Sequence, residues 1–222
     1  MFLACWSVKG GAGVSVIAAS LAQGLAASHG EALLVDLGSD QPDIVGIPPH
    51  EYPGVADWLA GGAAVPADGL SRLEIALAAG LRLLPRGNGP LLAGERAAVW
   101  LALLARDERP VVVDCGVPLG PHCGPGAEVA LAVAGSATRS LLVIRPCLAS
   151  LRRAMQATLR PSGVVVINEV GRVLGARDVA AVLQVPVVAE IPVDPTVART
   201  VDAGLLLSRP PRLLQRGLRH AA

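Results

Sequence analysis

The chain has 222 residues, of which 52% are hydrophobic and 17% charged, and its formal net charge is +1. This length suits a single core of moderate size. The apolar residues come in short runs, which excludes a membrane-spanning helix of about 20 residues, and the near-neutral charge gives no overall nucleic-acid footprint. No basic and apolar leader segment precedes the first motif, so we expect a cytoplasmic protein.

The first predicted elements are a strand, a tight loop and a helix. An apolar run from Phe2 to Val8 ends in the sequence Lys9-Gly10-Gly11-Ala12-Gly13, and small and apolar residues then recur at helical spacing from Ser15 to Ala27. Glycines let backbone N–H groups turn toward an anion, and the start of a helix adds partial positive charge. The pattern predicts a phosphate-binding loop; the alternative is an ordinary tight turn.

Lys9 stands out within this loop. Of the 19 basic residues, 18 are arginine and Lys9 alone is lysine. A compact ammonium on a flexible stem fits a crowded phosphate site differently from a planar guanidinium. We therefore interpret Lys9 as retained for lysine chemistry, the alternative being survival by chance.

The remaining elements predict a doubly wound α/β domain over residues 1–207. A second apolar run, Ala32 to Val35, ends at Asp36 and precedes an acidic loop at residues 40–43. Fully apolar strands that alternate with helices indicate a mainly parallel sheet covered on both faces. Further strands are expected at residues 81–84, 111–113, 140–144, 164–167 and 187–191, and helices at 94–105, 148–159, 176–183 and 195–203.

Two segments have no such pattern. The stretch Pro118 to Gly126 is rich in glycine and proline and is interpreted as a mobile loop. Residues 208–222 form a basic C-terminal tail in which four arginines alternate with three leucines, a pattern compatible with a helix on a membrane surface. Because Pro210, Pro211 and Gly217 shorten any helix there, a solvated terminus is the favoured alternative.

Isolated cysteines and one arginine cluster complete the candidates. The four cysteines lie far apart without a CxxC pair, which predicts buried free thiols rather than a metal site or disulfides. Arginines on one predicted helix could meet the phosphates of DNA, although most such clusters are solvated faces. The cysteines are Cys5, Cys115, Cys123 and Cys147, and the arginines are Arg152, Arg153 and Arg160.

The loop KGGAGVS resembles the deviant Walker A loop, KGGxGK followed by Ser or Thr, of the MinD, ParA and nitrogenase iron-protein group. The resemblance covers nearly the whole chain and implies a P-loop NTPase fold that binds ATP and Mg²⁺. It gives Lys9 the role of the signature lysine, which reaches across an ATP-sandwiched dimer, and gives Ser15 the hydroxyl that binds Mg²⁺. The phosphate cradle would comprise Lys9, Gly10, Gly11, Ala12, Gly13, Val14, Ser15 and Val16.

The chain departs from the family pattern at two positions. Val14 replaces the lysine that holds the β- and γ-phosphates, and the loss of such a charge-assisted contact costs about 1.5 to 3 kcal/mol of binding. In LLVDLGSDQPD, Asp36 matches the first acidic position, but Gly38 replaces the aspartate associated with the attacking water, for which Asp40 is the substitute at hand. Both departures weaken the expectation of ATP hydrolysis.

Other segments of the resemblance supply the remaining site residues. VVVDCG ends its strand in Asp114, as a Walker B strand does, and would hold Mg²⁺ together with Ser15 and Asp36. VVVIN nominates Asn168 as a contact of the adenine, and EIPVDP places Pro192 and Asp194 beside the base.

The resemblance implies a protein that positions cellular machinery, such as a division site, a pilus or secretion apparatus, or a replicon. It would act through nucleotide-linked homodimerisation and a protein partner or cargo, with weak or lost ATP hydrolysis, in the cytoplasm or peripherally at the inner face of the membrane. The alternatives are a pseudo-ATPase dimer scaffold without nucleotide, a DNA-binding partition ATPase, and a ligase or synthetase of the same superfamily.

Overall fold

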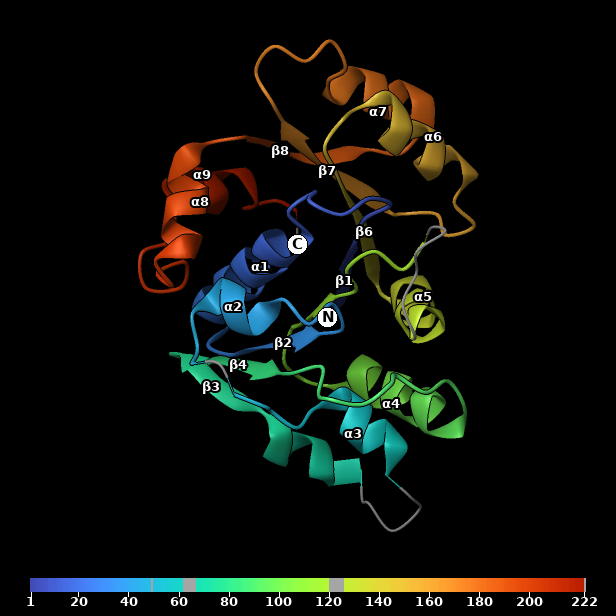
Figure 1. Cartoon of the computed structure of the whole chain (residues 1–222), viewed down its shortest axis with the longest axis vertical. Helices are drawn as coiled ribbons and strands as arrows, with labels where there is room; N and C mark the ends of the chain where they lie inside the picture. The colour runs from blue at the N-terminus through green and yellow to red at the C-terminus, as the bar shows by residue number, and fades with distance from the viewer. Residues whose placement is uncertain (49, 62–66, 120–125, 222) are drawn as a thin grey trace.

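One sheet organises the chain in the computed structural model, which describes residues 1–48, 50–61, 67–119 and 126–221 (Figure 1). Within these ranges eight strands are ordered β3-β4-β2-β5-β1-β6-β7-β8. All neighbouring strands run parallel except β3 and β4. The strands are β1 Phe2–Trp6, β2 Ala32–Asp36, β3 Ile75–Ala78, β4 Leu81–Leu84, β5 Val111–Asp114, β6 Arg139–Ile144, β7 Gly163–Asn168 and β8 Val187–Pro192.

Helices cover both faces of this sheet, which therefore has two separate cores (Figure 1). Helices α3 to α7 contribute to one core, whereas α1, α2, α8 and α9 pack on the other face. A short 3₁₀ helix spans Ala67–Leu73. The α-helices are α1 Val14–His29, α2 Gln41–Val45, α3 Val55–Ala60, α4 Glu95–Arg106, α5 Ala127–Ser136, α6 Leu148–Gln156, α7 Ala176–Leu183, α8 Pro195–Asp202 and α9 Arg212–Gly217.

The alternation of side chains along β1 explains why its sequence is apolar throughout. Phe2, Ala4 and Trp6 belong to the core under α4 and α5, whereas Leu3 and Cys5 belong to the core under α1. A parallel strand with helices on both sides has no solvated face. The predicted doubly wound α/β fold is confirmed.

Parallel pairing also fixes where functional side chains gather. In the register of β2 and β5, Asp36 lies opposite Asp114, and in that of β1 and β5, Cys5 lies opposite Asp114. The carboxyl ends of these three strands therefore meet at one edge, which is where open α/β sheets bind ligands.

Two segments differ from the sequence-based expectation, and a third is mostly outside the described residues. The acidic loop at residues 40–43 forms the start of α2, and the helix predicted over residues 148–159 ends at Gln156. Arg160 therefore lies outside α6, in line with the bias of a residue before proline against helical backbone. Most of the predicted mobile loop, residues 120–125 with Cys123, lies outside the described residues.

The cysteines within the described ranges are free thiols, as predicted. Cys5 and Cys115 are buried, and burial raises the pKa of both thiols. Cys147 is only partly buried. It caps the start of α6 and forms hydrogen bonds with Ser150.

The basic tail folds back onto the domain, so the expectation of a solvated terminus is wrong for its leucines. Leu214, Leu218 and Ala221 are buried in the core beneath α1, and α9 contacts both α1 and β8. These side chains cover apolar surface of the last strand, while the arginines between them stay outside. Within the described part of the chain no helix is both long and apolar enough to cross a membrane.

Gly217→Ala is expected to leave the free energy of unfolding about 1 kcal/mol below that of Gly24→Ala, because a β-carbon at position 217 would clash with Ile191 Cδ1 of β8, which has to shift. Gly24→Ala is the matched control, since its β-carbon would meet nothing within 4 Å in the exposed interior of α1. The free energy of unfolding of this control variant should rise by about 0.5 to 1 kcal/mol. Urea denaturation measures both changes, and equal effects would contradict the docking of α9 on β8.

Candidate functional site

The glycine-rich loop between β1 and α1 forms an open cradle. Gly11 and Gly13 have positive φ angles of 74° and 90°, a region in which L side chains are strained. A β-carbon placed at Gly10, Gly11 or Gly13 would meet no atom within 4 Å. Gly13 is the N-cap of α1 and offers no side-chain cap, so the first N–H groups of the helix are available to an anion.

Val14, the first residue of α1, carries no charge to this cradle. Its side chain is 7% exposed and belongs to the core on the α1 face of the sheet. The position that the resemblance assigns to the phosphate lysine is therefore filled by core packing. Any anion in the loop depends on backbone N–H groups and on cations from elsewhere.

Two buried carboxylates lie beside the start of α1. Asp36 Oδ1 accepts hydrogen bonds from the backbone N–H groups of Gly38 (2.9 Å) and Ser39 (2.8 Å). Asp114 Oδ1 accepts from Gly116 N at 3.0 Å, and the Ser15 hydroxyl also bonds this carboxylate. The structure thus brings together the three residues predicted to hold Mg²⁺.

Burial raises the pKa of both carboxyls. The pKa of Asp36 rises to about 7, because burial and then the charge of Asp114 oppose its ionisation more strongly than three backbone N–H groups favour it. Burial likewise raises the pKa of Asp114, against the hydrogen bonds of Ser15, Gly116 and Gln41. A cation bound beside this pair would lower both pKa values and favour the ionised carboxylates.

Gln41, which the sequence analysis did not single out, connects the parts of this site. It is the first residue of α2 and is fully buried. Its Nε2 donates to Asp114 Oδ2 (2.8 Å) and to the backbone oxygen of Ser15 (3.0 Å), and its backbone N–H donates to Asp36 Oδ2 (3.2 Å). One side chain therefore links the ends of β2 and β5 to the start of α1.

Gly38 and Asp40 line a neighbouring cavity of about 480 Å³. A β-carbon at Gly38 would lie 3.7 Å from Asp36 Oδ1 and 3.8 Å from Asp114 Oδ1, which is ordinary van der Waals contact. The backbone therefore leaves room for a side chain at position 38. Asp40 is exposed, and its charge contributes to raising the pKa of Asp114, so it lies near the pair without bonding to it.

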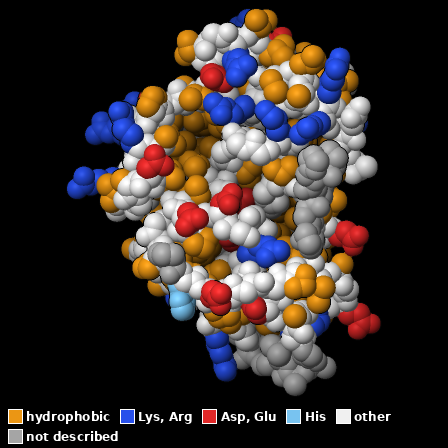
Figure 2. Space-filling model, viewed as in Figure 1, with side chains coloured by type: hydrophobic (Ala, Val, Ile, Leu, Met, Phe, Trp, Pro, Cys, Tyr) orange, Lys and Arg blue, Asp and Glu red, His pale blue; other side chains and the backbone are white. Residues whose placement is uncertain are grey.

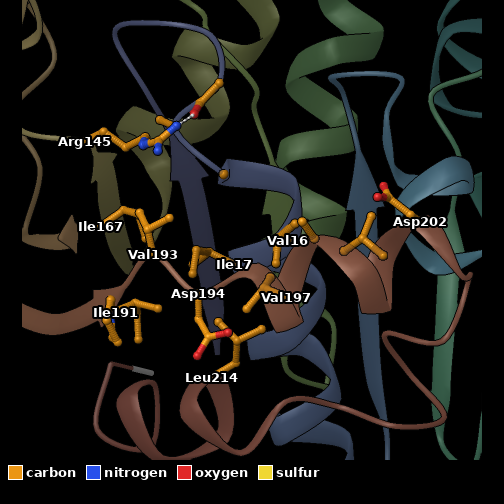
Figure 3. Close-up of a pocket in the computed structure, with 16 residues that line it drawn as sticks. Val16, Ile17, Arg145, Ile167, Ile191, Val193, Asp194, Val197, Asp202 and Leu214 are labelled. Carbon is orange, nitrogen blue, oxygen red and sulfur yellow. Dashed lines mark hydrogen bonds between the residues drawn. The ribbon is translucent and has the colours of Figure 1, made fainter. Parts of the chain in front are cut away.

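A second cavity, of about 420 Å³, lies on the other side of the glycine loop (Figure 3). Pro192 and Asp194 line it together with aliphatic side chains from α1, β7, β8, α8 and α9. Asp194 accepts hydrogen bonds from Thr196 N (2.7 Å) and Thr196 Oγ1 (2.6 Å) and so caps α8. The aliphatic residues include Val16, Ile17, Ile167, Ile191, Val197 and Leu214.

Asn168, predicted to contact the adenine, lies at the end of β7. It does not line the apolar cavity; its Nδ2 donates instead to Glu190 Oε2 at 2.9 Å, on the surface. The preceding residue of β7, Ile167, faces the cavity in its stead (Figure 3).

Cationic side chains flank the loop, and Arg145 is a second residue that the sequence analysis missed. Its Nη1 donates to the Gly11 oxygen at 3.5 Å, and it forms an ion pair with Glu169 at 3.6 Å. Lys9 and Arg145 also line a further cavity of about 250 Å³ with Arg172. Figure 2 shows Lys and Arg side chains along the upper part of this face, and Asp and Glu below them.

Comparison with solved structures finds the same fold in several ATPases. A ParA family ATPase from Chlorobium tepidum superposes with a TM-score of 0.75 at 21% identity, covering 97% of this chain and 95% of that one. MinD in the MinC:MinD complex of Aquifex aeolicus gives 0.75 at 17% identity, covering 99% and 95%. MinD of Pyrococcus horikoshii with Mg-ADP gives 0.72 at 18% identity, covering 97% and 91%.

At this level of identity the likeness shows the fold, and the predicted P-loop fold of the MinD and ParA ATPases is confirmed. No protein-family model matches the sequence, and no curated protein matches it either.

Proposed function

We propose that this chain is a positioning protein of the MinD/ParA type that binds ATP with Mg²⁺ weakly, hydrolyses it slowly or not at all, and acts as a homodimer with a protein partner in the cytoplasm. The observation that carries the proposal is the open glycine cradle beside Ser15 and the two buried carboxyls of Asp36 and Asp114. Backbone donors for phosphate and oxygen ligands for Mg²⁺ stand next to each other, as nucleotide binding requires.

Two of the similar solved structures contain a bound molecule and support this assignment by analogy. MinD of Pyrococcus horikoshii holds Mg-ADP, and MinD of Aquifex aeolicus forms a complex with MinC. For this chain, we propose that the nucleotide base enters the 420 Å³ cavity past Pro192, while the phosphates lie on the loop from Gly10 to Gly13. Aliphatic side chains there provide the apolar contact that a base requires.

Weak affinity and slow turnover follow from two side chains. Because Val14 is uncharged, it cannot form the charge-assisted contact with phosphate that a lysine would form. Such a contact contributes about 1.5 to 3 kcal/mol to the free energy of binding. Gly38 supplies no carboxylate to orient an attacking water, and positioning and electrostatics provide most of the catalysis in phosphoryl transfer.

A dimer scaffold that no longer binds nucleotide is the second candidate. It is favoured by the burial of Val14 and by the hydrogen bonds that Asp36 and Asp114 already receive from the chain itself. The two candidates differ in one observable, because only the first predicts that oligomeric state depends on ATP.

Calorimetric titration of ATP with Mg²⁺, with light scattering to follow oligomeric state, tests the proposal. Lys9→Ala is expected to weaken binding at least tenfold and to abolish ATP-dependent dimerisation, because removing a cation from a phosphate contact costs about 1.5 to 3 kcal/mol. Lys9→Arg should restore little of this, since a planar guanidinium is not equivalent to an ammonium in a crowded loop.

Arg152→Ala is the matched control, because it removes an exposed charge from α6. It should leave the affinity for ATP unchanged. If the wild-type chain binds no ATP at millimolar concentration, the nucleotide proposal fails and the scaffold remains. If Lys9→Ala binds and dimerises as the wild type does, the role of Lys9 fails.

A further inference from the structure

The orientation of the Gln41 amide is fixed by two acceptors. Asp114 Oδ2 and the Ser15 backbone oxygen both lie within hydrogen-bond distance of Nε2, and a carbonyl oxygen such as that of Ser15 can only accept a hydrogen bond. The amide oxygen, Oε1, is therefore not the atom that meets Ser15. It is buried and has no hydrogen-bond partner within the described residues.

An unpaired oxygen in this place indicates a missing donor or cation. Buried polar atoms are nearly always paired, so an exception needs a physical reason. Gln41 is 0% exposed, and the two neighbouring carboxylates, Asp36 and Asp114, are 1% and 0% exposed. Within the described residues neither carboxylate forms an ion pair with a basic side chain. Oxygen acceptors are concentrated here without a matching positive charge.

We propose that Gln41 is a binding residue for a divalent cation, supplying Oε1 to the ion or to a water bound to it, and that this chain takes up the ion without nucleotide. The inference rests on the proposed function only in assigning Ser15, Asp36 and Asp114 to divalent-cation chemistry. Its test contains no nucleotide, so failure of cation binding and failure of ATP binding are separate results.

The donor set suits a hard cation such as Mg²⁺ or Mn²⁺. Such ions prefer carboxylate, hydroxyl and amide oxygens, and two carboxylates balance a charge of +2. No group of three or more His, Cys, Asp and Glu side chains that could hold a metal occurs in the described ranges, so neutral oxygens have to complete this one. Val14 favours the ion further, because no lysine ammonium stands at the start of α1 to neutralise the carboxylates instead.

The neighbouring cavity provides access for the ion. Gly38 and Gly116 line the cavity of about 480 Å³, and the Oδ1 atoms of both aspartates lie within 4 Å of where a Gly38 β-carbon would stand. Asp40 on the cavity wall adds negative charge on the path of an approaching cation.

Titration of MnCl₂ and of MgCl₂ alone into the full chain, by calorimetry and by electron paramagnetic resonance of free Mn²⁺, tests the proposal. We expect one ion per wild-type chain. Gln41→Leu, which keeps the size of the side chain but removes both Oε1 and the Nε2 donor to Asp114 and Ser15, should weaken binding at least tenfold. Gln156→Leu, an exposed glutamine of α6, should leave affinity unchanged.

Two results would overturn the proposal. The wild-type chain binds no Mn²⁺ at millimolar concentration without nucleotide, which would mean that water alone meets Oε1. Gln41→Leu, with wild-type circular dichroism, binds the ion with wild-type affinity.

Discussion

Replacing Val14 with lysine is expected to tighten the binding of ATP by about 10- to 150-fold. The factor corresponds to the 1.5 to 3 kcal/mol that a hydrogen bond to a charged group contributes. Position 14 is the first residue of α1, directly after the loop whose N–H groups face the proposed phosphates. An ammonium on a four-carbon stem can leave the core and reach the loop, which has no atoms within 4 Å of its glycine β-carbon positions.

Val14→Met isolates the effect of charge from the effect of size. Both variants remove valine from the core on the α1 face and introduce a long flexible side chain, so their folding costs should be similar. Calorimetric titration of ATP with Mg²⁺ should give a much lower dissociation constant for Val14→Lys than for Val14→Met. Equal constants would mean that the loop does not hold phosphate near position 14.

Most of the sheet could be predicted because its strands are apolar on both faces. The runs at β1, β2 and β4 to β8 are bounded by glycine, proline or charge, and each was located within about two residues. The edge strand β3, Ile75–Ala78, was missed because it has only four residues. They alternate between half-buried and exposed, so the strand lacks the buried apolar run by which the others were identified. Short helices such as α2 were missed because five residues are too few for helical periodicity.

The candidate site was predicted only where a motif preserves it. Ser15, Asp36 and Asp114 follow recognisable segments and do meet at the sheet edge, as parallel pairing requires. Gln41 and Arg145 have no such pattern. The importance of each depends on which strand ends become neighbours, and a single sequence shows this only after the strand order is known.

The tail shows the opposite limitation. Arginines and prolines between residues 209 and 219 indicated a solvated segment, yet the leucines among them fill the space beside β8 and α1. Exposed arginines and buried leucines at alternating positions are typical of a short helix that lies on a surface, and the sequence does not say which surface. Here it is the protein's own last strand.

Asp36 is expected to produce a large dependence of stability on pH. Burial, then the charge of Asp114, raises its pKa in the folded chain to about 7, whereas in the unfolded chain it has the ordinary value near 3.8. Below about pH 4 both states hold the proton. Between about pH 4 and 7 only the folded state holds it, so the unfolded state binds fewer protons and the free energy of unfolding falls as pH rises. The loss is on the order of 4 kcal/mol.

Asp36→Asn should remove this slope. Asparagine offers one oxygen to the three N–H donors around Asp36, which costs stability at every pH. Because this penalty does not titrate, the difference between variant and wild type isolates the ionisation of Asp36. We expect urea denaturation from pH 4 to 8 in EDTA to show this difference in the free energy of unfolding, variant minus wild type, rising by on the order of 3 to 4 kcal/mol as pH rises.

Asp107→Asn provides a control of opposite sign. Although burial opposes it, hydrogen bonding to Arg109 lowers the pKa of Asp107, so that carboxylate stabilises the fold above its unfolded pKa, and this contribution is lost as pH falls. With the urea series extended to about pH 2, the free energy of unfolding of the Asp107 variant should fall relative to the wild type as pH rises to about 4, whereas that of the Asp36 variant rises relative to the wild type between about pH 4 and 7. If both differences have the same sign, burial of the Asp36 charge is not what opposes ionisation at the end of β2, and the need for a cation beside Asp114 loses its physical basis.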